Sequence, residues 1–222
     1  WIGDAASSAE EAGVRNKMWF AKSEDIDAEI RAKFLPLLET LAAGPLADDW
    51  AERGTSERLA AIIVLDQFSR NLFRGSPRAF SQDALALRLC KEGLSLREDL
   101  TLSEAERIFF YLPLEHSEDI GDQTRAVEMF SALVKDARSA FRQLAEATLE
   151  YAYAHKAVIE QFGRFPHRNA VLARGYSTPG SRQKIISNPL MASGEFGWPG
   201  WNPANWATIR YPTPNARLDP VL

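Results

Sequence analysis

The stretch SAFRQLAEATLEYAYAHKAVIEQF, Ser139 to Phe162, decides the fold. Phe141, Ala145, Leu149 and Ala152 recur along it at helical spacing and form one apolar stripe. Such a stripe buries one face of a helix against its neighbours and leaves the other faces to solvent. The pattern therefore predicts a single long helix with other helices packed along it.

The rest of the chain repeats this pattern, with capping residues, Gly and Pro between the segments. The expected helices run from Ser23 to Gly44-Pro45 with a kink near Pro36, from Ser56 through Phe68, from Ser76-Pro77 to Gly93, from a capping box at Ser103 and Glu106, from Gly121 to Ala137, and from His167 to Gly175. No segment alternates with a period of two, so no strands are expected. The chain is predicted to be all-α, with antiparallel helix pairs joined by short loops.

The C-terminal part has a different composition. Between Asn188 and Leu222 there are six Pro and three Trp residues, while charges become sparse. Prolines at this density exclude helix. We predict one helical domain over residues 1–187 and an irregular Pro/Trp-rich tail over 188–222, unless the tail is a non-native extension. We expect its tryptophans to dock on the domain or on a neighbouring chain, which would make a homo-oligomer.

Composition excludes several classes of function. A net charge of -4 and a pI near 5.5, without a basic stripe, argue against nucleic-acid binding. No apolar run is long enough to span a membrane, and the start WIGDAASSAEEAG is neither a signal peptide nor a natural Met start, so the start is expected to be trimmed or partial. The lone Cys90 excludes an internal disulfide, which predicts a cytoplasmic protein.

Directly after the long helix, the run QFGRFPHRN, Gln161 to Asn169, crowds polar residues around a turn. Phe162 and Phe165 give the loop an apolar anchor, while Gly163 and Pro166 fix its turn. The remaining side chains are hydrogen-bond donors held at set positions: Arg164, His167, Arg168 and Asn169. Such a loop suits an anion.

A second run, LDQFSRNLFRG, spans residues 65–75. If it is helical, one face carries charges at i, i+4 and i+8 with two amides beside them: Asp66, Arg70, Arg74, Gln67 and Asn71. The plain alternative is a surface pair between Asp66 and Arg70, which is worth little energy. The functional interpretation is favoured because Arg and Asn occur together beside Gly in both runs.

A third run, YLPLEHSEDIGDQ, spans residues 111–123 and is acidic. Its polar residues are Glu115, His116, Glu118, Asp119, Asp122 and Gln123. His155 shares its helix face with apolar neighbours, so we expect it to be a packed, hydrogen-bonded core residue. His116 and His167 are flanked by charges, so we expect them to act on a ligand.

Spacing argues against the common cofactor sites. The chain has no HxxxH, no HExxH and one Cys, so no metal site is expected. The phosphate-binding loops GxGxxG and GxxxxGK and the serine elbow GxSxG are missing from the sequence, so no cofactor is predicted.

Two interpretations of the three runs stay open. In the first, they form a site for a small anionic ligand or a peptide carboxylate. The arginines Arg70, Arg74, Arg164 and Arg168 would hold the anion, and the amides Gln67, Asn71 and Asn169 would orient it. His116 or His167 would transfer a proton, oriented by Glu118 or Asp119, while Asp66, Gln123 and His155 complete the lining. In the second, the carboxylates from Glu115 to Asp122 neutralise the arginines in a buried network that fixes the fold. The protein would then be a scaffold for a partner.

Three longer stretches contain these runs: LAAIIVLDQFSRNLFRGSPRAFSQD, RIFFYLPLEHSEDIGDQ and HKAVIEQFGRFPHRNAVLARGYSTP. With Trp19-Phe20, they strongly resemble the bacterial family catalogued as domain of unknown function 924, from Trp1 to about Pro179. The resemblance implies an α-α superhelix related to tetratricopeptide repeats and no assigned activity. The chain departs from the family at Ala173, where Gly is usual, and at Gly180, where an acidic pair is usual. The tail from Asn188 does not resemble the family.

Overall fold

A computed structural model describes residues 1–175 of the chain. Over this part the protein is built from helices and short turns and contains no strand, which confirms the all-α prediction. The α-helices are α1 (Ala9–Phe20), α2 (Glu24–Ala42), α3 (Pro45–Arg53), α4 (Thr55–Ile62), α5 (Ser69–Leu72), α6 (Asp83–Ser95), α7 (Glu104–Glu115), α8 (Ile120–Asp136), α9 (Arg142–Phe162) and α10 (Arg168–Val171). The predicted tail, its tryptophans and Gly180 lie outside the described residues.

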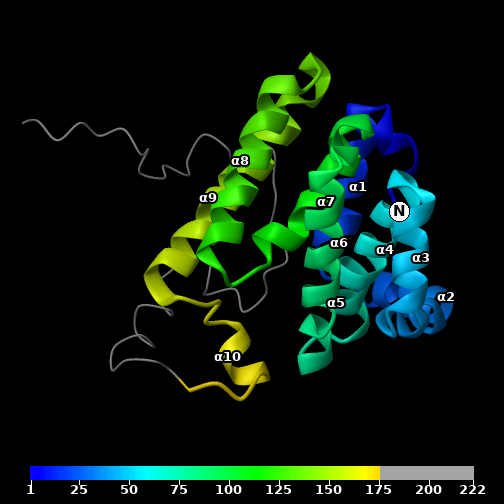
Figure 1. Ribbon diagram of the computed structural model, residues 1–222, viewed down its shortest axis with the longest axis vertical. Helices are drawn as coiled ribbons and strands as arrows, with labels where there is room; N and C mark the ends of the chain where they lie inside the picture. Colours follow the sequence, from blue (N-terminus) through cyan, green and yellow to red (C-terminus); the bar gives the residue numbers. More distant parts are fainter. Residues whose placement is uncertain (176–222) are drawn as a thin grey trace, which may run out of the picture.

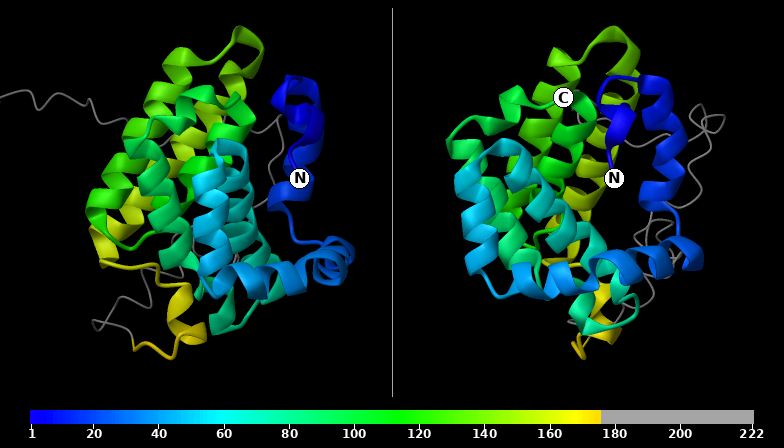
Figure 2. Two further views of the ribbon diagram at one scale, coloured as in Figure 1. Left: turned by 45° about the vertical axis from the view of Figure 1, so that its right-hand side comes forward. Right: turned by 90° about the vertical axis from the view of Figure 1, so that its right-hand side faces the viewer.

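The helices pack as neighbouring pairs around α7. The long helix α9 packs against α8, and both contact α7, whose other neighbours are α4 and α6 (Figure 1). Helix α2 crosses one end of the other helices (Figure 2). Every residue of α7 except Glu106 is buried, and its ring-bearing residues Phe109, Phe110 and Tyr111 are almost completely so. The buried helix α7 therefore carries the residues at its carboxyl end, Glu115 and His116, into the interior.

Most of the expected helix boundaries are close to the observed ones. At the start of α7, the backbone N–H of Ser103 donates to Glu106 Oε2 at 2.8 Å, as the capping-box pattern predicts. Gly93, expected to end its helix, instead lies inside α6. A Cβ at this position would approach Phe110 Cζ to 2.5 Å, so close packing against α7 accounts for the glycine. Helices α1 and α3 were not predicted, since the buried residues of α3 are the small alanines Ala47 and Ala51, and those of α1 include the polar Asn16.

The helix that carries the second run is not regular. Between α4 and α5 the chain forms a π-helical turn over Ile63–Phe68, and all six of its residues are buried. A π turn contains an extra residue per turn and therefore changes which side chains share a face; such turns are frequent at functional sites. Asp66 and Gln67 consequently point into the protein, while Arg74 lies beyond the end of α5 at Leu72. The prediction of one face shared by Asp66, Arg70 and Arg74 is wrong for Arg74.

Ala173, where the sequence resemblance leads one to expect Gly, has an unusual backbone conformation. Its φ of 52° lies in the left-handed region, where a Cβ costs about 1–2 kcal/mol. Because glycine loses about 0.5–1 kcal/mol through chain entropy, Ala173→Gly is expected to stabilise the protein by about 0.5–1 kcal/mol. The exposed Ala170 of α10 is the matched control, and Ala170→Gly should destabilise by about 0.5–1 kcal/mol. Urea denaturation measures both, and equal destabilisation would contradict the left-handed conformation.

Candidate functional site

Asp66 is the centre of the site. Its carboxylate is 1% exposed and accepts hydrogen bonds from His116 Nδ1 at 2.8 and 3.0 Å and from Gln67 Nε2 at 2.6 Å. Arg70 Nη1 lies 3.1 Å from the same carboxylate and donates to the backbone carbonyl of Asp66 at 2.6 Å. Burial alone would raise the pKa of Asp66, but the charge of Arg70 and the hydrogen bonds from His116 and Gln67 outweigh it and hold this pKa far below its ordinary value. Asp66 is therefore an ionised acceptor.

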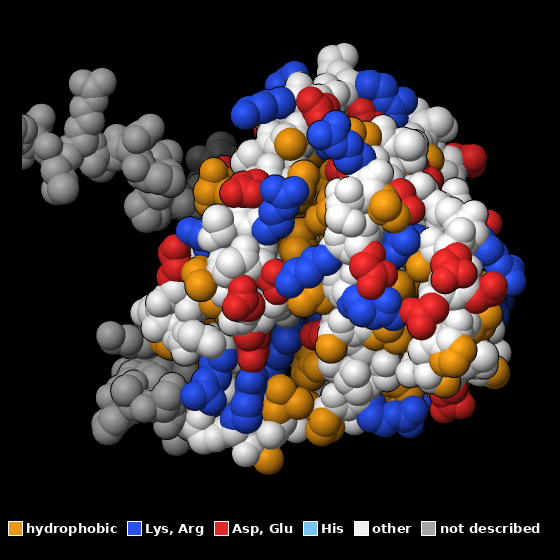
Figure 3. Space-filling model, viewed as in Figure 1, with side chains coloured by type: hydrophobic (Ala, Val, Ile, Leu, Met, Phe, Trp, Pro, Cys, Tyr) orange, Lys and Arg blue, Asp and Glu red, His pale blue; other side chains and the backbone are white. Residues whose placement is uncertain are grey.

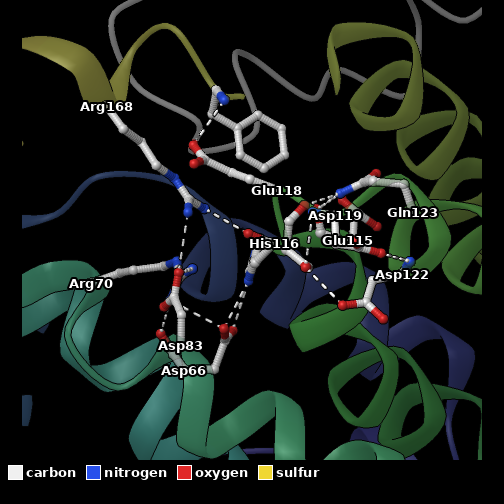
Figure 4. Close-up of polar contacts among 12 residues, drawn as sticks. Asp66, Arg70, Asp83, Glu115, His116, Glu118, Asp119, Asp122, Gln123 and Arg168 are labelled. Carbon is white, nitrogen blue, oxygen red and sulfur yellow. Dashed lines mark hydrogen bonds and ion pairs between the residues drawn. The ribbon is translucent and has the colours of Figure 1, made fainter. Parts of the chain in front are cut away.

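A second carboxylate, Asp83 at the start of α6, is shared by two arginines (Figure 4). Arg70 Nη2 donates to its Oδ2 at 3.1 Å, and Arg168 Nη1 donates to the same oxygen at 3.2 Å. Arg168 Nη2 also donates to the carbonyl oxygen of His116 at 3.1 Å. We call Asp66, Arg70, Asp83, His116 and Arg168 the polar cluster. It joins the second and third runs to α6 and α10.

The two guanidinium groups of the polar cluster have unequal surroundings. Arg168 lies between the rings of Phe80 and Phe165, with its Cζ 4.6 and 4.7 Å from their centroids. Burial, only partly offset by Asp83, lowers the pKa of Arg168 to about 10. Among the described residues, its buried Nε has no hydrogen-bond partner, and neither has the buried Oδ1 of Asn169. The cluster's own side chains therefore do not satisfy its polar atoms completely.

The other two histidines lie beside the polar cluster. His155 is buried, with Nδ1 3.0 Å from Glu115 Oε1 and 2.9 Å from the Tyr151 carbonyl, as expected of a packed core residue. The rings of His116 and His155 are 6.4 Å apart. Burial and the positive charge of Arg168 lower the pKa of His167 to about 2, so this histidine stays neutral.

Several predicted residues instead support the backbone or pair with other residues. Glu118 accepts a hydrogen bond from the backbone N–H of Phe165 at 2.9 Å. It also accepts from Nη1 and Nη2 of Arg174 at 2.6 and 2.9 Å. Asp119 caps α8 by accepting from the N–H of Asp122, and Gln123 donates to two backbone carbonyls. Neither Glu118 nor Asp119 orients His116; that expectation is wrong because Asp66, buried by the π turn, occupies the position instead.

The remaining candidates separate into two places. Asn71 Nδ2 and Arg74 Nε both donate to Asp27 of α2, at 2.8 and 2.5 Å, so these two residues pair away from the polar cluster. Arg164 is half-buried in the loop QFGRFPHRN and makes no ion pair or hydrogen bond with the described residues. Lys and Arg side chains gather near α10 and the end of α9 (Figure 3).

The ion pairs agree in part with the second interpretation, an internal network. Arg70, Arg74 and Arg168 form ion pairs with Asp66, Asp83 and Asp27. Within residues 1–175, none of the three forms an ion pair with a carboxylate between Glu115 and Asp122. Asp83 and Arg174 were missed as site residues. Asp83 is the last residue of the first stretch of family resemblance, and this signal could have identified it.

Within residues 1–175, no three His, Cys, Asp or Glu side chains come together as ligands for a metal ion. None of the helices described there has the length and apolar character to cross a membrane.

Comparison with known proteins assigns the chain to a family. Residues 1–183 match the family described as "Bacterial protein of unknown function (DUF924)". No curated protein matches the chain. A solved structure of the protein of unknown function ATU0120 from Agrobacterium tumefaciens is 33% identical, with 85% of this chain and 100% of that chain covered and a TM-score of 0.68. The chain belongs to the bacterial family DUF924.

Proposed function

We propose that the polar cluster binds a small anion, a phosphate or a carboxylate, with Arg168 as its main donor. The observation that carries this proposal is the sharing of Asp83: Arg70 and Arg168 both donate to one oxygen of a single carboxylate. Arg70 has a second carboxylate in Asp66, whereas the other acceptor of Arg168 is a neutral carbonyl. A buried guanidinium with half a counter-ion gains from an external anion, because charge-assisted pairs with oxyanions are strong and often bidentate.

Arg164 supports the same function. It lies four residues before Arg168 on the turn between α9 and α10, and no described residue pairs with it. Arg164 therefore offers a further guanidinium group on the turn that leads to Arg168. The tetratricopeptide-like order of the helices and a cytoplasmic location remain part of this proposal.

A second candidate function is hydrolase-type chemistry, favoured by the pairing of His116 with Asp66. A buried carboxylate on Nδ1 is the arrangement that orients a histidine as a general base through Nε2. His116 suits this role better than His167, whose pKa of about 2 makes it a weak base.

The test of anion binding is a titration of full-length protein with phosphate and with acetate, followed by thermal shift and calorimetry. Arg168→Ala is expected to weaken binding by about tenfold to a hundredfold, the loss of one charge-assisted hydrogen-bonded pair. Arg74→Ala is the matched control. It also removes an arginine side chain, but this arginine pairs with Asp27 away from the polar cluster, so the affinity for the anion should not change.

A separate variant distinguishes binding from folding. Arg164→Ala is expected to weaken anion binding without lowering the melting temperature, because the described residues offer it no partner to lose. If no anion stabilises the wild type while Arg168→Ala alone lowers the melting temperature sharply, the cluster is an internal ion-pair network and the proposal is wrong.

A further inference from the structure

The imidazole of His116 carries one ring nitrogen, Nε2, that the contacts with Asp66 leave as a hydrogen-bond acceptor. Asp66 is ionised and can only accept, so the proton of the neutral ring is on Nδ1 and the lone pair is on Nε2. Nε2 makes no hydrogen bond with any described residue, and the side chain is 16% exposed. Burial and the nearby charge of Arg70 lower the pKa of His116, which keeps the ring neutral and Nε2 unprotonated.

This acceptor lies among donors. His116 Nδ1 and Arg70 Nη1 bind the same oxygen of Asp66, at 2.8 and 3.1 Å, so the imidazole and the guanidinium flank one atom. Arg168 donates to the carbonyl of His116 itself. The ring of His116 therefore belongs to the same small cluster as the two guanidinium groups, and at neutral pH it can accept, but not donate, a hydrogen bond.

We propose that the ligand of the polar cluster is an oxyanion that keeps a proton, namely phosphate or a phosphate monoester, whose P–OH donates to Nε2 of His116 while its charged oxygens accept from the arginines. The inference rests on the proposed function of the cluster as an anion site. A phosphate monoester has its second pKa at about 6 and so retains a proton on a substantial fraction of molecules near neutrality. Sulfate and simple carboxylates carry no proton there.

An oxyanion without a proton would turn an oxygen lone pair toward the lone pair of Nε2. Both acceptors would then lose a hydrogen bond to water without gaining one, and a site that leaves a polar group unpaired discriminates strongly against such a ligand. His116 would therefore determine specificity, while the arginines supply the affinity.

The experiment is calorimetry on the full chain at a pH of about 6, near the second pKa of a phosphate monoester. The probes are inorganic phosphate, methyl phosphate, sulfate and dimethyl phosphate. Dimethyl phosphate carries the same single negative charge as dihydrogen phosphate but no proton, and so isolates the proton from the charge. Phosphate or methyl phosphate should bind at least about tenfold more tightly than sulfate and dimethyl phosphate.

The variants test the assignment to His116. In His116→Ala the preference over sulfate and dimethyl phosphate should fall to less than about threefold, whereas Arg74→Ala should keep it. The series on the wild type decides the question even if His116→Ala does not fold. Tighter binding of methyl phosphate than of phosphate supports a monoester as ligand, and the reverse supports free phosphate.

Equal affinity of the wild type for all four anions would overturn the inference and leave anion binding intact. A preference for protonated anions that persists in a folded His116→Ala variant would overturn the role of His116. If none of the four anions binds while acetate does, this inference fails and the anion site stays; if acetate does not bind either, both this inference and the proposed function fail.

Discussion

Replacing Asp66 by alanine is expected to lower the free energy of unfolding by about 3–5 kcal/mol, because it leaves buried hydrogen-bond donors without their acceptor and removes one of the two carboxylates that pair with Arg70. Asp66 is 1% exposed and receives His116, Gln67 and Arg70 at once. Urea denaturation followed by circular dichroism measures the change.

Asp27→Ala is the matched control for this effect. Asp27 likewise accepts hydrogen bonds from two side chains, those of Asn71 and Arg74. The side chain of Asp27 is 17% exposed, however, and that of Arg74 is 33% exposed. Exposed pairs of this kind contribute about 0–1 kcal/mol. If both variants lose the same small amount of stability, Asp66 is not the buried centre of the cluster.

The second large effect is a loss of stability as the pH falls. The pKa of His167 is about 2 in the folded protein and about 6.5 in the unfolded chain, so between these values only the unfolded state binds the proton. The stabilising contribution is complete above the unfolded value and is lost progressively as the pH falls below it. One such histidine lowers the free energy of unfolding by about 2 kcal/mol between pH values of about 7.5 and 5.

The measurement is the free energy of unfolding against pH for the wild type and His167→Gln. The variant should show a shallower slope, by about 1.4 kcal/mol per pH unit below a pH of about 6. His116, whose pKa is also lowered by burial, should leave a residual slope of the same sign in the variant. Parallel curves for the two proteins would contradict a buried neutral His167.

The sequence was sufficient for features that depend on local pattern. The apolar stripe from Phe141 to Ala152 predicted the long helix α9. The side chain of Phe165 is buried beside Ile159, as expected for the apolar anchor of the loop. The three polar runs were singled out by composition alone, and residues from all three meet in or beside the polar cluster.

Pairing across the chain could not be predicted in the same way. The extra residue of the π turn at Ile63–Phe68 leaves no mark in a periodicity of 3.6, yet it separates Asp66 from Arg74. Asp83 and Asp27 have the spacing of ordinary acidic residues in a first helical turn, which the helix dipole alone explains. Their partners are set by helix packing over long sequence separations, such as the 85 residues between Asp83 and Arg168.

The central claim, that Arg168 keeps binding capacity for an external anion, is tested most directly by following arginine side chains during a phosphate titration. In nuclear magnetic resonance spectra of the full chain, the Nε–Hε signal of Arg168 is identified by its loss in Arg168→Lys, and that of Arg74 by its loss in Arg74→Lys. We predict that phosphate shifts the Arg168 signal saturably and leaves the Arg74 signal, whose guanidinium is bound to Asp27, in place. An Arg168 signal that does not move, or moves only as much as that of Arg74, would contradict the claim.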